Sequence, residues 1–307
     1  MTGHHHDHGL DDHLNPRQLR QRLVMALGIS FIVLVVSVIG ALVTGSLALL
    51  ADAGHILTDL TGLLISLLAL TLAARPATLH RTFGLQRLEI LAAAANALLL
   101  FLIAGFIAFE AWNRWQDPSE IDGPLMLVFA VVGLIANLIG MRLLKAGSQQ
   151  SLNLKGAYLE MMGDLLGSVA VIIAALGIWL TGWERIDPLI SVVVVVMILP
   201  RAWLLLREAL SILLETTPKS INLDEVREHL LSQPDVIDVH DMHAWTITSG
   251  LEVLSAHVVV RTDDPRCDTG AVLQELQECL RGHFNIEHST LQIEPEGFEH
   301  PSATLHQ

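Results

Sequence analysis

Ionisable side chains recur at helical spacing inside two of the most apolar segments of this 307-residue chain. Asp52, His55 and Asp59 are separated by three and four positions, and Glu160 and Asp164 are also four positions apart. Residues three and four positions apart lie on the same face of an α-helix. Each group is therefore expected to present its polar atoms on one helix face.

Imidazole nitrogens and carboxylate oxygens are ligands that divalent transition metals accept. His55, Asp59, Glu160 and Asp164 offer one nitrogen and three carboxylates, which suits a tetrahedral Zn²⁺ ion. The same groups also bind protons, so metal and protons would compete for them. These residues therefore predict a metal site with a chemical basis for exchange. A structural polar network is the alternative interpretation.

The composition indicates a membrane part followed by a small globular part. Hydrophobic residues make up 52% of the chain and its mean hydropathy is +0.52, which is high for a soluble protein. The formal net charge of −14 argues against nucleic-acid binding, which needs a basic face. Cys267 and Cys279 both follow the apolar part and indicate reduced cytoplasmic thiols rather than a disulfide framework.

Six segments are long and apolar enough to cross a bilayer, which takes roughly 20 residues per helix. They are predicted at about 23–44, 47–74, 88–112, 123–144, 155–181 and 187–208. The first carries no charged residue and is too long for the apolar part of a signal peptide, so we expect it to remain as a span. Ionisable residues within spans normally face the bundle interior or a water-filled cavity.

Lysine and arginine are unevenly distributed between the connections, and the richer side is normally cytoplasmic. The opposite side holds Arg114 and Arg185. The richer set consists of Arg17, Arg20, Arg22, Arg75, Arg81, Arg87, Arg142, Lys145, Lys155, Arg201 and Arg207. Both termini are therefore expected in the cytoplasm, with the chain in the inner (plasma) membrane.

After Pro218 the pattern predicts a small α+β domain. Helices are expected at 223–231 and 272–280, strands at 236–248 and 251–260, and a last short strand ending at 294. Ser249-Gly250 between the first two strands is a hairpin signal, and the order αββαβ suits a ferredoxin-like unit. The predicted organisation is a His-rich segment (1–21), a six-helix transmembrane domain (22–214), a cytoplasmic domain (215–298) and a tail (299–307).

Several segments together resemble one family. These are SLALLADAGHILTD at 46–59, RTFGLQRLE at 81–89, GAYLEMMGD at 156–164 and HDMHAW at 240–245. The first three resemble the cation diffusion facilitators, and the fourth resembles the start of that family's cytoplasmic domain. The resemblance covers about residues 15–296. It implies a homodimer that exports divalent metal by proton antiport, alternating between inward-facing and outward-facing states, with its cytoplasmic domain binding metal and dimerising.

The residue at the first ligand position of the fifth span affects which metal is expected. Many zinc-type members of the family carry His there, whereas this chain has Glu160. Ala-Tyr-Leu-Glu followed by Asp164 resembles the zinc, cobalt and cadmium resistance branch. The expected cargo is therefore Zn²⁺, with Co²⁺ and Cd²⁺ as well. His55 disfavours magnesium and calcium, and manganese-type members tend to carry Asp at that position.

Further metal-binding residues are expected outside the spans. The resemblance places cytoplasmic ligands at His240, His257 and Glu294, while Gln292 stands where some members carry a second-site His, which weighs against a binuclear site. Ordinary sheet histidines beside a surface acid are the alternative. A histidine run at the N-terminus is interpreted as a native metal collector rather than an engineered tag; it comprises His4, His5, His6 and His8.

Four more residues have expected supporting roles. Arg87 and Glu215 match family positions that pair near the membrane–cytoplasm junction and would couple the two halves of a dimer; two unrelated interfacial charges are the alternative. Asp52 and Asn137 are candidate accessory residues of the transport site, with helix packing as the alternative role for Asn137.

Three functions fit a membrane metal site: an antiporter, a passive channel and a membrane-bound metal sensor. A channel needs weak binding at several sites, and a sensor needs an output module beyond the αββαβ unit. The sequence contains no motif for a nucleophile–base pair or a phosphate-cradling loop. A secondary transporter without an organic cofactor is therefore favoured over an enzyme or an ATP-driven pump, with the lipid bilayer, metal ions and protons as partners.

Overall fold

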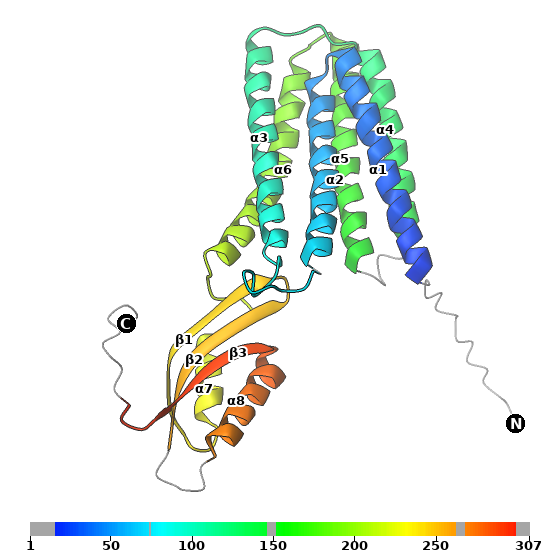
Figure 1. The fold of residues 1–307 in the computed structure, drawn as a ribbon. Coiled ribbons are helices and arrows are strands. Elements are labelled where there is room, and N and C mark those ends of the chain that lie inside the picture. Colours follow the sequence, from blue (N-terminus) through cyan, green and yellow to red (C-terminus); the bar gives the residue numbers. More distant parts are fainter. Residues whose placement is uncertain (1–15, 74, 146–151, 262–267, 299–307) are drawn as a thin grey trace, which may run out of the picture. The chain divides into compact units, whose positions relative to one another are not determined.

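The computed structural model describes residues 16–73, 75–145, 152–261 and 268–298 (Figure 1). His4, His5, His6 and His8 lie outside the described residues. The chain divides into two compact units, one formed by residues 1–64 with 96–203 and the other by residues 65–95 with 204–307. The division falls within the second, third and sixth helices.

Within the described residues, six long helices confirm the predicted spans. They are α1 (Pro16–Thr44), α2 (Leu47–Ala73), α3 (Leu88–Gln116), α4 (Gly123–Lys145), α5 (Leu152–Thr181) and α6 (Ile186–Leu213). Each contains a stretch long and apolar enough to cross a membrane. Gly45 (φ 72°) and Gly182 (φ 68°) directly follow α1 and α5, because a left-handed residue after a helix favours glycine.

In the first unit, α2 joins two groups of helices. One buried cluster combines Leu47 and Ala51 of α2 with residues of α3 and α6. Another combines Ala48 and Leu49 of α2 with residues of α1, α4 and α5. Consecutive residues of α2 therefore contact both groups, which places its polar side chains inside the bundle.

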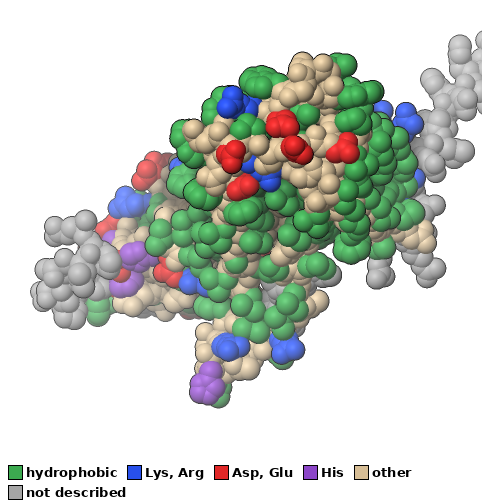
Figure 2. All heavy atoms as spheres, turned by 90° about the horizontal axis from the view of Figure 1, so that it is seen from above, with side chains coloured by type: hydrophobic (Ala, Val, Ile, Leu, Met, Phe, Trp, Pro, Cys, Tyr) green, Lys and Arg blue, Asp and Glu red, His purple; other side chains and the backbone are tan. Residues whose placement is uncertain are grey.

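The outer faces of the bundle are apolar. Leu42, Leu102 and Leu180 are each more than 70% exposed, and Figure 2 shows hydrophobic side chains along the sides while acidic side chains gather at the end in view. The connections around α4 and α6 supply exposed acids such as Asp117, Glu120 and Asp122. An apolar surface of this extent suits lipid or another protein rather than water.

The αββαβ domain has the predicted order of elements. Its elements are α7 (Leu223–Leu231), β1 (Val236–Thr248), β2 (Leu251–Val260), α8 (Thr269–Phe284) and β3 (His288–Pro295). The sheet order is β1-β2-β3; β1 and β2 form an antiparallel hairpin, and β2 pairs in parallel with β3 after the crossover through α8 (Figure 1). Gly250, in the hairpin turn, has φ 77°, as such turns require.

Alternation along the strands separates two faces of this sheet. Leu254, Ala256 and Val258 of β2 belong to the core shared with Val226 of α7 and Leu276 of α8. Side chains of a strand alternate between faces, so His257 lies on the face away from the helices. Its register partners, His240 on β1 and Gln292 on β3, share that open face.

Candidate metal centres

Three of the four predicted transport ligands meet inside the first unit. His55 Nε2 lies 3.7 Å from Asp59 Oδ2, one turn along α2, and 3.8 Å from Asp164 Oδ1 of α5. One donor atom from each residue lies within 4.8 Å of the others. The side chains are largely buried, with exposures of 15% for His55 and Asp59 and 6% for Asp164.

Several polar atoms of this cluster have no hydrogen-bond partner among the described residues. His55 Nδ1, Asp59 Oδ2 and Asp164 Oδ1 are buried and make no hydrogen bond to any residue that the structure describes. Buried polar atoms normally have partners, because leaving them unpaired costs free energy. Carboxylates grouped around an imidazole fit a divalent cation, which would offset both the missing contacts and the repulsion between the acids.

Glu160 lies outside this group of three. Its Oε1 accepts a hydrogen bond from Arg201 Nη2 of α6 at 2.9 Å, and its side chain is 45% exposed. Arg201 Nη1 also lies 3.7 Å from Asp59 Oδ2, so one arginine contacts both acids. From the sequence, Arg201 counts only toward the balance of charge between connections, because nothing local links it to positions 59 and 160.

The two accessory candidates have other partners. Asp52 is buried, and its Oδ2 accepts a hydrogen bond from Ser37 Oγ at 3.2 Å. Asn137 Nδ2 donates to Ser168 Oγ at 3.3 Å, which ties α4 to α5. By its spacing, Asp52 belongs to the same face of α2 as His55 and Asp59. Its side chain, however, accepts its hydrogen bond from Ser37 of α1.

A buried aspartate that no sequence pattern singles out holds the start of α2. Asp187, which is fully buried, accepts hydrogen bonds from Ser46 Oγ at 2.6 Å, from the Leu47 amide at 2.7 Å and from the Ala48 amide at 3.1 Å. These amides belong to the first turn of α2, whose N–H groups have no partner within the helix. A carboxylate from α6 therefore caps the helix that carries His55 and Asp59.

The αββαβ domain brings its predicted ligands together on the open face of the sheet. His240 Nε2 lies 3.2 Å from Glu294 Oε2, and His257 Nδ1 lies 2.8 Å from Glu294 Oε1. Glu294 is 3% exposed, and Gln292 Nε2 donates to its Oε1 at 2.8 Å. Two imidazoles and a buried carboxylate from three neighbouring strands form a donor set that fits Zn²⁺.

A β-bulge adds two residues to this cluster. The register shifts between His240, opposite His257, and His243, opposite Ser255, and Asp241 within the bulge has φ 50°. Its carboxylate lies 3.8 Å from His257 Nε2 and 3.0 Å from His243 Nε2. In a regular strand, Asp241 would lie on the opposite face of the sheet from its neighbour His240. Sequence periodicity therefore could not identify Asp241 as part of this cluster. Bulges often redirect side chains in this way.

One ion pair and one set of hydrogen bonds join elements within the second unit. Arg87 Nη2 donates to Glu215 Oε1 at 2.7 Å, with the side chains 39% and 57% exposed. Glu89, in the first turn of α3, accepts hydrogen bonds from Thr248 and from Ser249, the latter at 3.0 Å. The start of α3 is therefore connected to the β1–β2 hairpin turn.

Two family models match most of the chain. The cation efflux transmembrane domain matches residues 23–214, and the cytoplasmic domain of cation efflux proteins matches residues 218–296. Together with the six apolar helices, these matches indicate a multi-pass membrane protein.

Curated relatives are similar over nearly the whole length. The metal cation efflux system protein CzcD of Cupriavidus metallidurans is 45% identical over 306 residues, covering 99% of this chain and 94% of that protein. The zinc transporter ZitB of Escherichia coli is 40% identical, covering 99% and 96%. The cadmium, cobalt and zinc/H(+)-K(+) antiporter of Bacillus subtilis is 36% identical over 305 residues, covering 99% and 95%.

A solved metal-bound C-terminal domain of the CzcD transporter is also similar. It is 39% identical, covers 24% of this chain and 99% of that domain, and has a TM-score of 0.22.

Proposed function

Since the chain belongs to the cation efflux, or cation diffusion facilitator, family, we propose that it exports Zn²⁺, and also Co²⁺ and Cd²⁺, from the cytoplasm in exchange for protons. The observation that carries this proposal is the buried cluster of His55, Asp59 and Asp164 between two membrane helices. The names of the relatives from Cupriavidus, Escherichia and Bacillus agree with this range of metals and with antiport.

Each ligand has a role that follows from its chemistry. His55 supplies a nitrogen that transition metals accept and that magnesium and calcium avoid. Asp59 and Asp164 supply negative charge on α2 and α5, so metal binding joins the two helices. Glu160 completes a four-ligand site when it leaves Arg201 for the metal. Arg201 then serves as the alternative partner that holds Glu160 in the metal-free site.

Exchange follows from competition at the same atoms. Metal binds deprotonated carboxylates and a neutral imidazole, so binding releases protons and protonation releases metal. In the proposed cycle, metal enters from the cytoplasm, the bundle opens the site to the other side, and protons displace the metal. Inward return of the protonated site completes the cycle. One compact site supports a carrier over a channel, which needs weak binding at several sites.

We further propose that the protein works as a homodimer in the inner membrane with both termini in the cytoplasm. The Lys/Arg bias between the connections supports this orientation. The Arg87–Glu215 pair supports a junction at the membrane surface that couples the halves of the dimer. The predicted domain limits of 1–21, 22–214, 215–298 and 299–307 fit this arrangement.

The cluster on the open face of the sheet is proposed to bind a regulatory Zn²⁺. His240, His257 and Glu294 converge there, with Asp241 beside His257. Metal at this site would draw the two cytoplasmic domains of the dimer together and favour transport. Replacing His240, His257 and Glu294 together by Ala is expected to lower the metal content of the purified protein and to reduce transport; unchanged metal content and unchanged transport would rule this role out.

Transport is tested in proteoliposomes that carry an imposed pH gradient. Wild-type protein is expected to move Zn²⁺, Co²⁺ and Cd²⁺ faster than Mn²⁺, at rates that follow the gradient, and Asp164→Ala is expected to fall to the rate of protein-free liposomes. Metal movement that ignores the pH gradient would support a channel instead. Transport that survives Asp164→Ala would refute the proposed site.

A further inference from the structure

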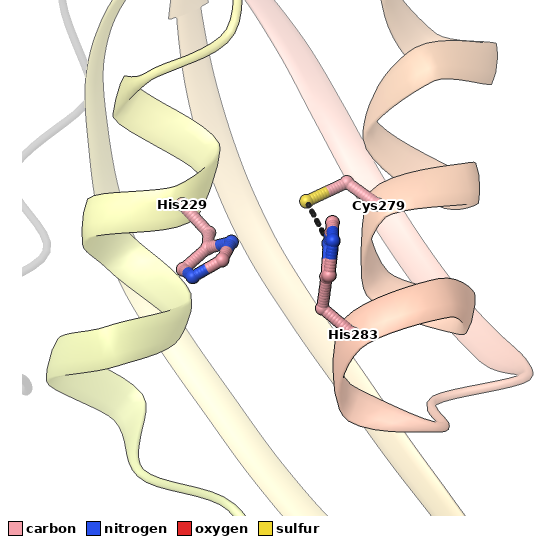
Figure 3. Close-up of side chains that lie close together, drawn as sticks. All are labelled: His229, Cys279 and His283. Carbon is pink, nitrogen blue, oxygen red and sulfur yellow. Dashed lines mark hydrogen bonds between the residues drawn. The ribbon is translucent and has the colours of Figure 1, made fainter.

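A third group of metal-ligating side chains lies between the two helices of the αββαβ domain. His229 comes from the last turn of α7, and Cys279 and His283 come from α8. Figure 3 shows the three side chains directed toward one another. Cys279 Sγ lies 3.6 Å from His283 Nδ1, and one donor atom from each residue lies within 4.8 Å of the others.

This cluster is separate from the His240–His257–Glu294 cluster. The helices cover the face of the sheet that carries Leu254, Ala256 and Val258, whereas His257 points to the other face. A metal ion between α7 and α8 would therefore share no ligand with an ion on the open face. The two sites are distinguishable by substitution.

The spacing of the donors matches a tetrahedral ion. With a Zn–S bond of about 2.3 Å and a Zn–N bond of about 2.0–2.1 Å, sulfur and nitrogen ligands of one zinc ion lie roughly 3.5 Å apart. Cys279 Sγ and His283 Nδ1 already have this separation, because positions four apart meet on one helix face. His229 is exposed, and its ring centroid lies 5.0 Å from that of His283, so a small side-chain rotation completes the set.

Packing alone explains this arrangement less well than metal binding does. A buried cysteine often serves as a small apolar residue, and Cys279 does lie beside the core residue Leu280. Its sulfur, however, faces the nitrogen of His283. His229 and His283 are both exposed and need no burial of their own, yet their rings contact each other.

We propose that His229, Cys279 and His283 form a thiolate-containing site for Zn²⁺ or Cd²⁺ that links α7 to α8. Sulfur favours these soft and borderline ions over manganese, magnesium and calcium. Three protein ligands leave the fourth position to water, which suits an exchangeable ion. Burial raises the pKa of the Cys279 thiol, so binding must also release its proton.

Binding is tested with Co²⁺ as a spectroscopic substitute, in the full-length protein in detergent. The parent variant is Cys267→Ser, which leaves Cys279 as the only cysteine. Titration is expected to produce a thiolate-to-cobalt charge-transfer absorption that reaches a plateau, to which only cobalt bound at Cys279 contributes and cobalt at the two other proposed sites does not. Excess Zn²⁺ or Cd²⁺ should displace the cobalt and abolish the band. Because the measurement needs no transport, its outcome is independent of the proposed export activity.

Variants in the Cys267→Ser background assign the ligands. Cys279→Ser is expected to abolish the charge-transfer band, and His229→Gln or His283→Gln is expected to weaken cobalt binding at least about tenfold. His288→Gln, an exposed histidine on β3, is the matched control and should leave the band unchanged. Circular dichroism verifies that each variant is folded. A parent protein without the band, or a band that survives both cluster His→Gln changes, would overturn the site.

Discussion

Arg201 Nη2 of α6 lies 2.9 Å from Glu160 Oε1 of α5, and this ion pair keeps Glu160 apart from the other three predicted ligands. Arg201 Nη1 also reaches within 3.7 Å of Asp59 Oδ2. A cationic side chain at the edge of a metal site competes with the metal for the same carboxylates. The relationship therefore bears directly on how tightly the site binds its cargo.

Arg201→Gln is expected to tighten metal binding. An ion pair this exposed is worth about 0.2–1 kcal/mol, so freeing Glu160 should raise the apparent Zn²⁺ affinity by up to roughly fivefold. Isothermal titration of the purified protein measures the change. Arg207→Gln, at another exposed arginine of α6, is the control. Weaker binding in Arg201→Gln would show that the arginine assists the site rather than competing with it.

Comparing Asp59→Asn with Asp52→Asn distinguishes a proposed metal ligand from a nearby buried acid that is not a ligand. Asp59 contacts His55, whereas Asp52 is hydrogen-bonded to Ser37. Changes to residues that merely support metal ligands already cost about 10–100-fold in affinity, so Asp59→Asn should weaken Zn²⁺ binding by at least about tenfold. Asp52→Asn should have a much smaller effect. Equilibrium dialysis measures both affinities, and equal losses would place Asp52 in the site.

Asp187→Asn is expected to destabilise the bundle. The change replaces a carboxylate that caps two α2 amides and accepts from Ser46, and breaking buried hydrogen bonds of this kind costs about 1–3 kcal/mol. Thermal unfolding in detergent should show a lower Tm.

Ser191→Ala serves as the control for Asp187→Asn. Ser191 is equally buried and donates only to the Asp187 backbone carbonyl, so its removal should lower the Tm less. Equal Tm losses in the two variants would argue that local packing, rather than the cap, matters.

Gly40→Ala tests the close approach of α1 and α4. A Cβ at position 40 would lie 2.7 Å from Phe129 Cγ and 3.0 Å from its Cβ, atoms near the base of the side chain that cannot swing aside easily. Overpacking of this kind costs about 1–3 kcal/mol, so the Tm should fall.

Gly105→Ala, in α3, has nothing within 4 Å of the added Cβ. It should leave the Tm unchanged or raise it slightly, because alanine favours helices over glycine. A Tm loss in this control equal to that of Gly40→Ala would refute the steric explanation.

The sequence by itself determined the features that depend on local periodicity. Runs of apolar residues predicted all six long helices, and β-rich segments around Ser249-Gly250 predicted the hairpin with β1 and β2 at 236–248 and 251–260. Spacing by four residues put His55 with Asp59 on one helix face. These predictions succeeded because the position of a side chain on a helix or strand follows from its immediate neighbours in the chain.

Only the tertiary structure decided which distant residues meet. Arg201 forms an ion pair with Glu160, and Asp187 caps a helix that begins 140 positions earlier. His229 lies close to Cys279. The bulge that turns Asp241 toward His257 likewise breaks the alternation on which sequence reasoning relies. Such contacts depend on how whole elements pack against each other, and that packing is set jointly by many side chains rather than by the spacing within one segment.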